Sequence, residues 1–160
     1  MKLAVYTVSL PEFDLAESVA VLKEMGYEAV EWRVDVTDGE SPLKAMFANM
    51  PEEQKYAFRY WTDNHATLNI NDIMNECLRA KKVCDEVGIE IVNLATTLKG
   101  KPEEMENTIA AAAAIGCKTV RDASDPQQER RINSKDRAFF CTQGQALSRD
   151  ALALDRKSVV

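Results

Sequence analysis

Residues 86–94 read Glu-Val-Gly-Ile-Glu-Ile-Val-Asn-Leu, and two further segments of the chain have the same form. Residues 24–32 read Glu-Met-Gly-Tyr-Glu-Ala-Val-Glu-Trp, and residues 114–122 read Ala-Ile-Gly-Cys-Lys-Thr-Val-Arg-Asp. Each segment has a glycine, the residue type most common just beyond a helix end, followed closely by a mostly apolar run. The repeat therefore predicts a helix, a short turn and a strand, three times over.

The residues before each glycine have the spacing of an amphipathic helix. Asp14 and Glu17 stand three apart, a pattern typical of the capping box that begins many helices. Apolar residues then recur on one face of each predicted helix: Leu15, Val19 and Leu22 in the first; Ile73, Cys77, Ala80, Cys84 and Val87 in the second; Met105, Ile109 and Ala112 in the third. The third helix opens with Pro102, Glu103 and Glu104, residues that favour a first helical turn. We expect three helices, each packed by one face against the rest of the protein.

The predicted helices alternate with four predicted strands, at residues 3–9, 29–34, 89–95 and 118–121. Residues 89–94 are almost continuously apolar, which is typical of a strand covered on both faces. Because strands alternate with helices along the chain, we predict an α/β fold whose parallel sheet is built from right-handed (β/α) units.

Composition excludes some classes of function. The chain has 160 residues, of which 46% are hydrophobic and 29% are charged, and its net charge is -6. The acidic balance repels a phosphate backbone, so we expect no nucleic-acid partner. No apolar stretch approaches the roughly 20 residues that span a bilayer, and the start of the chain lacks the pattern of a secretory signal. We therefore expect no membrane partner and a cytoplasmic location.

Cysteine and histidine residues do not form a recognisable metal motif. The four cysteines are Cys77, Cys84, Cys117 and Cys141, with no Cys-x-x-Cys pair, and His65 is the single histidine. A structural zinc site is therefore not predicted. Cys77 and Cys84 stand about two helical turns, roughly 10 Å, apart, which is too far for a disulfide. We expect reduced, buried thiols, as in a cytoplasmic protein.

Residues 35–69 form the longest interval between predicted elements, and we expect a long loop there. Its turn signals come first and an aromatic and basic cluster follows, which comprises Tyr56, Phe58, Arg59, Tyr60 and Trp61, with Asn64 and His65 just after. In a parallel α/β sheet such a loop projects from the C-terminal ends of the strands, where ligands bind.

Four segments in order resemble the sugar phosphate isomerase/epimerase family, which belongs to the xylose isomerase-like TIM barrels. They are residues 1–10 (Met-Lys-Leu-Ala-Val-Tyr-Thr-Val-Ser-Leu), 27–33 (Tyr-Glu-Ala-Val-Glu-Trp-Arg), 59–70 with Arg-Tyr-Trp and Thr-Leu-Asn-Ile, and 88–94 (Gly-Ile-Glu-Ile-Val-Asn-Leu). The resemblance covers about residues 1–121. It implies that residues 1–122 are the first four β/α units of an eight-unit barrel.

The resemblance also implies a chemistry. Members of this family act on a sugar or sugar phosphate and move a proton or hydride next to its carbonyl, helped by a divalent metal (Mn, Zn, Mg or Co) that stabilises the oxyanion. The metal ligands come mainly from the later strands, so they are not identifiable in this chain. The endonuclease branch of the superfamily needs several histidines and a basic groove, and one histidine with a net charge of -6 disfavours it.

The length of the chain limits how much of the predicted barrel it can form. A complete barrel needs about 200 residues or more, so this chain supplies about half of one. Residues 123–160 carry seven basic and five acidic residues and lack the helix-glycine-strand repeat, with only a weak helical pattern at 145–156. We expect an atypical, poorly ordered tail and favour a truncated chain. The alternatives are an inactive fragment, a non-catalytic half barrel that binds a small molecule, or a half barrel that a second copy closes.

Glu31 is the candidate catalytic residue. It stands near the end of the second predicted strand, at the edge where barrel enzymes place their chemistry, and would bind substrate hydroxyls or tune the metal. The alternative is a structural ion pair with Arg33 or with Arg121 of a neighbouring strand. No metal ligand is assigned.

The candidate substrate-binding residues are Trp61, Asn64, Asn93 and Arg121. Trp61 and Asn64 would form a wall of a sugar pocket, or would instead pack the long loop onto the barrel. Asn93 would reach the same pocket unless strand alternation points it at the helices. Arg121 would contact a substrate phosphate. His65 fits a surface or capping residue better than a ligand or base.

Overall fold

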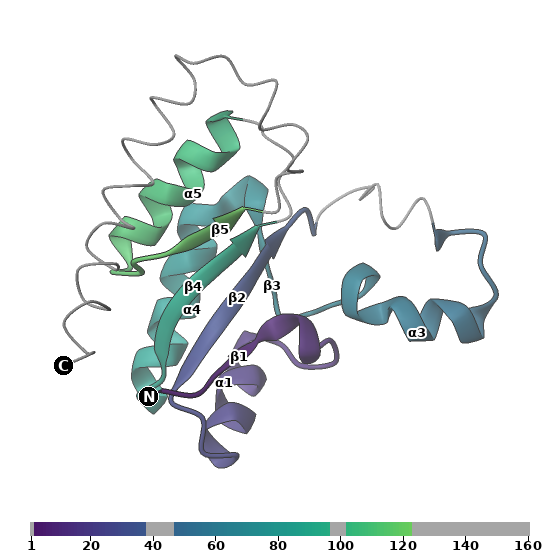
Figure 1. Cartoon of the computed structure of the whole chain (residues 1–160), viewed down its shortest axis with the longest axis horizontal. Coiled ribbons are helices and arrows are strands. Elements are labelled where there is room, and N and C mark those ends of the chain that lie inside the picture. The colour runs from purple at the N-terminus through teal and green to yellow at the C-terminus, as the bar shows by residue number, and fades with distance from the viewer. Residues whose placement is uncertain (1, 38–46, 97–101, 123–160) are drawn as a thin grey trace, which may run out of the picture.

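A parallel sheet with helices packed against one face forms the centre of the protein in a computed structural model, which describes residues 2–37, 47–96 and 102–122 (Figure 1). The strands are β1 (Ala4–Tyr6), β2 (Ala29–Asp35), β3 (Thr67–Asn69), β4 (Glu90–Thr96) and β5 (Val120–Asp122). The helices are α1 (Leu15–Glu24), α3 (Glu52–Thr62), α4 (Ile73–Val87) and α5 (Pro102–Ala114), with 3₁₀ turns η1 (Thr7–Ser9) and η2 (Ile70–Asp72). The predicted α/β fold with a parallel sheet is confirmed.

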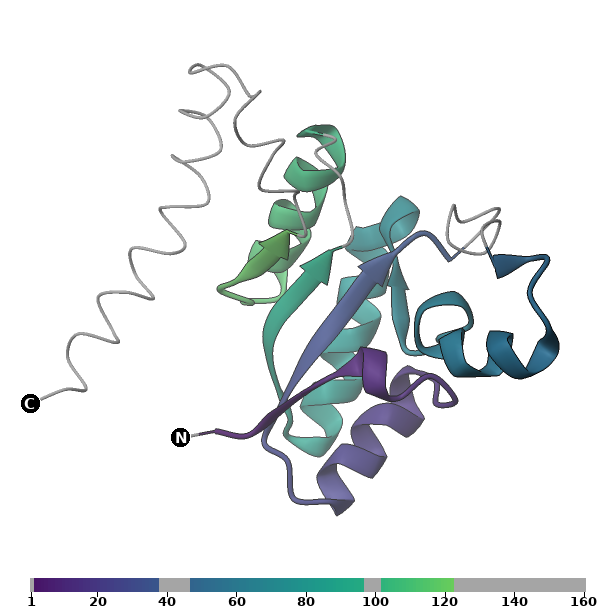
Figure 2. The same ribbon diagram turned by 45° about the vertical axis from the view of Figure 1, so that its right-hand side comes forward.

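The strands keep their chain order across the sheet except for β3, which lies between β2 and β4 in the chain but pairs with β2 off the main path. Their order in the sheet is β1-β2-β4-β5, and every described pairing is parallel. Helix α4 packs against both α1 and α5, and the three helices lie behind the sheet in Figure 1 and on the same side in Figure 2. The opposite face of the sheet, called the open face below, carries none of these three helices.

Strand alternation divides the residues of β2 between the two faces. Val30, Trp32 and Val34 belong to the core formed with α1, α4 and α5, and Trp32 is completely buried. The residues between them, Glu31 and Arg33, therefore point to the open face.

The three repeated glycines end their helices as predicted. Gly26, Gly88 and Gly116 have φ angles of +82°, +70° and +73°, which L-residues with a side chain rarely adopt. At the end of α4, the Gly88 N–H bonds to the carbonyl of Asp85 and the Ile89 N–H bonds to that of Cys84. The Asp14–Glu17 capping box is also confirmed, since each side chain accepts a hydrogen bond from the other residue's backbone N–H.

The long predicted loop at residues 35–69 contains a helix and a strand, α3 and β3. Residues 51–53 read Pro-Glu-Glu, the same opening that predicts a helix at 102–104. No residue of α3 is buried. Strand β3 pairs with the second half of β2, on the side where β1 pairs with the first half. Strands β1 and β3 thus lie end to end. The first predicted strand, at 3–9, is shorter than expected, because the chain turns into η1 at Thr7.

Some sequence expectations lie outside the described residues. These are the character of the tail at 123–160, the weak helix at 145–156 and the state of Cys141. In the described part of the chain, no helix has both the length and the apolar character needed to cross a membrane. Cys77, Cys84 and Cys117 are buried free thiols, as expected.

Candidate functional site

Three of the residues predicted from sequence meet on the open face. Arg121 of β5 donates from Nε to Oε1 of Glu31 on β2 over 3.1 Å, and its Nη2 bonds to the same oxygen. Asn93 of β4 is the register partner of Glu31, between the two charged residues. Glu31, Asn93 and Arg121 are called the open-face triad below.

A bulge in β4 decides the direction of Asn93. Ile91 is the partner of Val30, but Asn93 is the partner of Glu31, so Val92 is one extra residue between the two pairs. Without the bulge Val92 would lie beside Glu31, and Asn93 would point towards the helices. The extra residue therefore places Asn93 opposite Glu31 in the sheet, on the open face.

The triad has unused hydrogen-bonding capacity. Both bonds from Arg121 go to Oε1 of Glu31, and within the described residues Oε2 receives none. The Asn93 Oδ1 atom is buried without a hydrogen-bond partner among those residues. The Arg121 side chain is 56% exposed and that of Glu31 24%, so the pair is open to a ligand from solvent.

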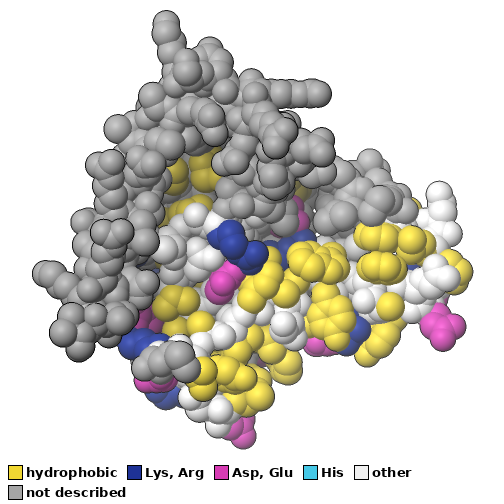
Figure 3. All heavy atoms as spheres, in the orientation of Figure 1, with side chains coloured by type: hydrophobic (Ala, Val, Ile, Leu, Met, Phe, Trp, Pro, Cys, Tyr) yellow, Lys and Arg dark blue, Asp and Glu magenta, His cyan; other side chains and the backbone are white. Residues whose placement is uncertain are grey.

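Tyr6 of β1 contacts Arg121 of the open-face triad from the opposite edge of the sheet. The Arg121 Cζ atom lies 5.0 Å from the centroid of its ring. Burial raises the pKa of Tyr6 above its usual value, although Arg33 and Arg121 act in the opposite direction. The phenol is thus neutral at physiological pH and can donate a hydrogen bond. Figure 3 shows hydrophobic side chains on this side of the molecule over β1 and α3, with a basic and an acidic side chain in contact over the sheet.

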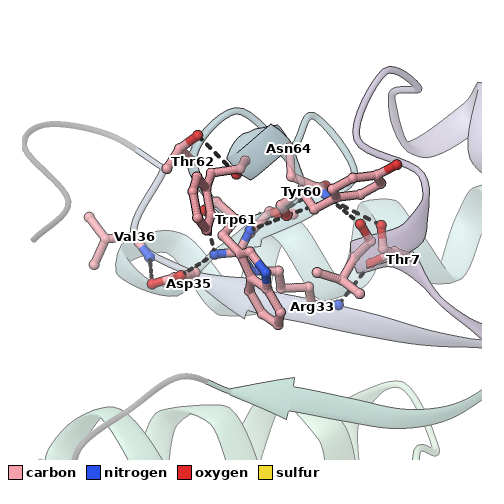
Figure 4. Close-up of polar contacts among 11 residues, drawn as sticks. Thr7, Arg33, Asp35, Val36, Tyr60, Trp61, Thr62 and Asn64 are labelled. Carbon is pink, nitrogen blue, oxygen red and sulfur yellow. Dashed lines mark hydrogen bonds and ion pairs between the residues drawn. The ribbon is translucent and has the colours of Figure 1, made fainter. Parts of the chain in front are cut away.

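Arg33, which sequence analysis did not single out as a site residue, organises a second group of contacts at the C-terminal end of β2. It is only 3% exposed, and its Nη1 bonds to the Tyr60 carbonyl at 3.1 Å. Its Nη2 bonds to the Trp61 carbonyl at 2.9 Å and to Oδ2 of Asp35 at 2.5 Å (Figure 4). The guanidinium therefore compensates both the carbonyls that end α3 and a neighbouring carboxylate.

Asn64 and Trp61 lie together beside Arg33, but they are placed differently. The Asn64 side chain donates to the carbonyls of Thr7, Val8 and Tyr60 and accepts from the Thr67 hydroxyl. Its amide thus joins α3 to η1 and β3. Trp61 is 43% exposed, and the Arg33 Cζ atom lies 5.5 Å from the centroid of its ring. Of the two, only the ring of Trp61 is presented to a ligand.

A cavity of about 500 Å³ lies beside this second group, and Arg33, Asp35, Trp61, Asn64 and His65 are among its lining residues. His65 is largely exposed, with Nε2 3.7 Å from an Asp63 carboxylate oxygen. The open-face triad does not line the cavity. The two regions are adjacent, because Glu31 and Arg33 are alternate residues on the same face of β2.

The open face gives no set of ligands for the divalent metal that the family resemblance implies. Within residues 2–37, 47–96 and 102–122, the His, Cys, Asp and Glu side chains form no group of three that could hold a metal ion. The carboxylates of Glu31 and Asp35 are each bonded by an arginine. The described residues of the open face therefore do not fit such a metal.

Sequence reasoning missed Arg33, Asp35 and Tyr6 as members of the site. A signal was present, because Glu31, Arg33 and Asp35 alternate with apolar residues in β2, which places all three charges on one face.

No protein-family model, curated protein or solved structure matches this chain.

Proposed function

We propose that the open face of the sheet binds a small sugar or sugar phosphate, and that the chain belongs to an isomerase/epimerase-like protein of the barrel type. The observation that carries the proposal is the open-face triad, which brings a carboxylate, an amide and a guanidinium from three neighbouring strands together. Carboxylate and amide oxygens accept hydrogen bonds from sugar hydroxyls, and a guanidinium binds a phosphate or an oxyanion. The parallel order β1-β2-β4-β5, which follows the chain apart from β3 at the edge, also supports a barrel.

In this proposal Glu31 is the proton-transfer group. Its free Oε2 takes the proton from the carbon next to the sugar carbonyl and returns it to the adjacent carbon, while a hydroxyl proton passes between the two oxygens. The electrons of the broken C–H bond form the C=C bond of an enediol intermediate. Aldose and ketose therefore interconvert without an external oxidant. Arg121 stabilises the developing oxyanion or holds a phosphate, and Tyr6 donates a hydrogen bond.

Deuterium exchange tests the chemistry. The full chain is incubated in D₂O with a panel of aldose and ketose phosphates and their unphosphorylated forms, with and without Mn²⁺ or Mg²⁺, and the substrate is followed by NMR. We expect deuterium at the carbon next to the carbonyl, and at least a hundredfold loss of that exchange in Glu31→Gln, in line with the usual contribution of general acid–base catalysis.

Matched variants that each remove a basic side chain test the binding role. Arg121→Gln is expected to weaken the binding of phosphorylated sugars more than that of unphosphorylated ones. Lys81→Gln is the control, because it also removes a basic side chain from an exposed ion pair, with Asp85 on α4, and neither residue lines the cavity beside Arg33. The absence of binding by any member of the panel at millimolar concentration would refute the proposal.

A non-catalytic binding module is the second candidate, and the ion pair between Glu31 and Arg121 favours it. A carboxylate held by a guanidinium in the resting state fits a structural or binding role as well as a catalytic one. Sugar binding without deuterium exchange in any metal condition would select this candidate.

We also propose a cytoplasmic location. Its support is that the three described cysteines are free thiols, as is usual in that reducing compartment.

A further inference from the structure

The two outermost strands each have one unpaired edge. Within the described residues β1 and β3, on one side of the sheet, pair only with β2, and β5, on the other side, pairs only with β4. The outward edge of a strand presents N–H and C=O groups that can pair with another strand. Leu3, directly before β1, is 56% exposed and adds an apolar side chain beside this edge.

We propose that a second copy of this chain covers both edges, with β1 of each copy paired to β5 of the other in a closed, two-fold symmetric barrel. This inference rests on the barrel-type fold of the proposed function and goes beyond it in how the barrel closes. The mass of the protein tests it without any ligand or catalysis.

The number of strands supports closure by two copies. Strands β1, β2, β4 and β5 lie side by side in that order, and β3 adds no width because it lies end to end with β1. Two copies thus place eight strands around a ring, the number found in the parallel α/β barrel. A two-fold axis along the barrel keeps all strands parallel and makes the two new contacts identical.

The charges of the open face also suit a second copy. Glu31 and Asp35 supply two negative charges on β2, and Arg33 with Arg121 supplies two positive ones, joined in ion pairs. Because these charges balance, the open faces of two copies do not repel one another, although the whole chain carries a net charge of -6. Helices α1, α4 and α5 already cover the other face, so they would form the outer layer of the barrel.

The chain's own residues 123–160 are the competing occupant of the edges. Their length corresponds to about one β/α unit, which is enough to cover one edge but not to supply the four strands that closure needs. For this reason a second copy is the better occupant.

The test is the mass of the full chain in solution, measured by light scattering and sedimentation over a wide range of concentration. The expected mass is twice the 17.9 kDa of the chain. Leu3→Lys places a charge beside the β1 edge and is expected to raise the dimer dissociation constant at least tenfold. Leu78→Lys is the control, since it makes the same change at an exposed residue of α4 and should leave the dimer intact.

Hydrogen exchange of the wild-type protein keeps the test decisive if Leu3→Lys fails to fold. Backbone amides of β1 and β5 should exchange more slowly at concentrations where the dimer forms than after dilution. A folded monomer at all concentrations would overturn the proposal and favour residues 123–160 as the cover. Growth beyond a dimer would also overturn it, and so would a dimer with no change in exchange at β1 and β5.

Discussion

Arg121 of β5 lies over the ring of Tyr6 of β1, 5.0 Å from the ring centroid, although β2 and β4 separate the two strands. Neighbouring strands lie about 4.8 Å apart, so this contact bridges a width of about 14 Å. The arginine extends across β4 to bond to Glu31, which is the register partner of Tyr6. One charged side chain thus connects the first and last strands of the open face.

The two open-face arginines should differ strongly in their effect on stability. Arg33→Gln leaves a partly buried Asp35 carboxylate and the carbonyls at the end of α3 without their buried cation, a loss that costs about 3–5 kcal/mol of unfolding free energy when an ion pair is buried. Arg121→Gln breaks a more exposed ion pair, and we expect a cost below about 1 kcal/mol. Urea unfolding of both variants measures the difference. Equal losses would contradict the structural role assigned to Arg33.

The two tryptophans provide a spectroscopic check on the fold. Trp32 is completely buried in the core and Trp61 is 43% exposed beside Arg33. In Trp61→Phe, which retains Trp32, we expect blue-shifted fluorescence and weak quenching by acrylamide. In Trp32→Phe, which retains Trp61, we expect red-shifted fluorescence and strong quenching. The same accessibility in both variants would be incompatible with the packing of β2 against the helices.

The sequence was sufficient to predict the helices that pack against the sheet. The residues that cap each helix and form its apolar face lie close together along the chain. The capping residues, the apolar face and the terminal glycine of α1 are all contiguous. Helix α3 was not predicted, because its aromatic residues were interpreted as a loop cluster although residues 51–53 repeat the Pro-Glu-Glu opening of α5.

The site was only partly predictable, because it depends on pairing between distant strands. The sequence indicates an ion pair between Glu31 and Arg121 as the alternative to a catalytic role for Glu31, since both residues stand near the ends of predicted strands. The direction of Asn93 depends on the extra residue Val92, which only the pairing with β2 identifies. The burial of Arg33 depends on α3, a helix that the sequence did not predict.

Alkaline pH should destabilise the protein through its buried thiols. Burial raises the pKa of Cys77 from 9.0 to about 12 and that of Cys84 to about 11. Above pH 9.0 the unfolded chain therefore loses thiol protons that the folded chain keeps, and stability falls as pH rises towards the folded pKa values. Each thiol can contribute up to about 1.4 kcal/mol per pH unit in that window.

Urea unfolding across this pH range measures the effect. Cys77→Val, which keeps a small apolar side chain in the core, should show a shallower loss of stability above pH 9.0 than the wild type. An identical slope in the two proteins would mean that the Cys77 thiol titrates normally in the folded state.

Asn64 distinguishes a structural contact from a sugar-binding one. Its amide bonds to three carbonyls and to the Thr67 hydroxyl, so Asn64→Ala leaves several partly buried groups unsatisfied. We expect a loss of about 1–3 kcal/mol in the free energy of unfolding. Asn75→Ala is the control, because the Asn75 amide makes an exposed bond to Asp72 on the surface of α4 and its removal should change stability little. If Asn64→Ala keeps wild-type stability but binds sugar less tightly, the amide contacts a ligand instead of holding α3 to η1 and β3.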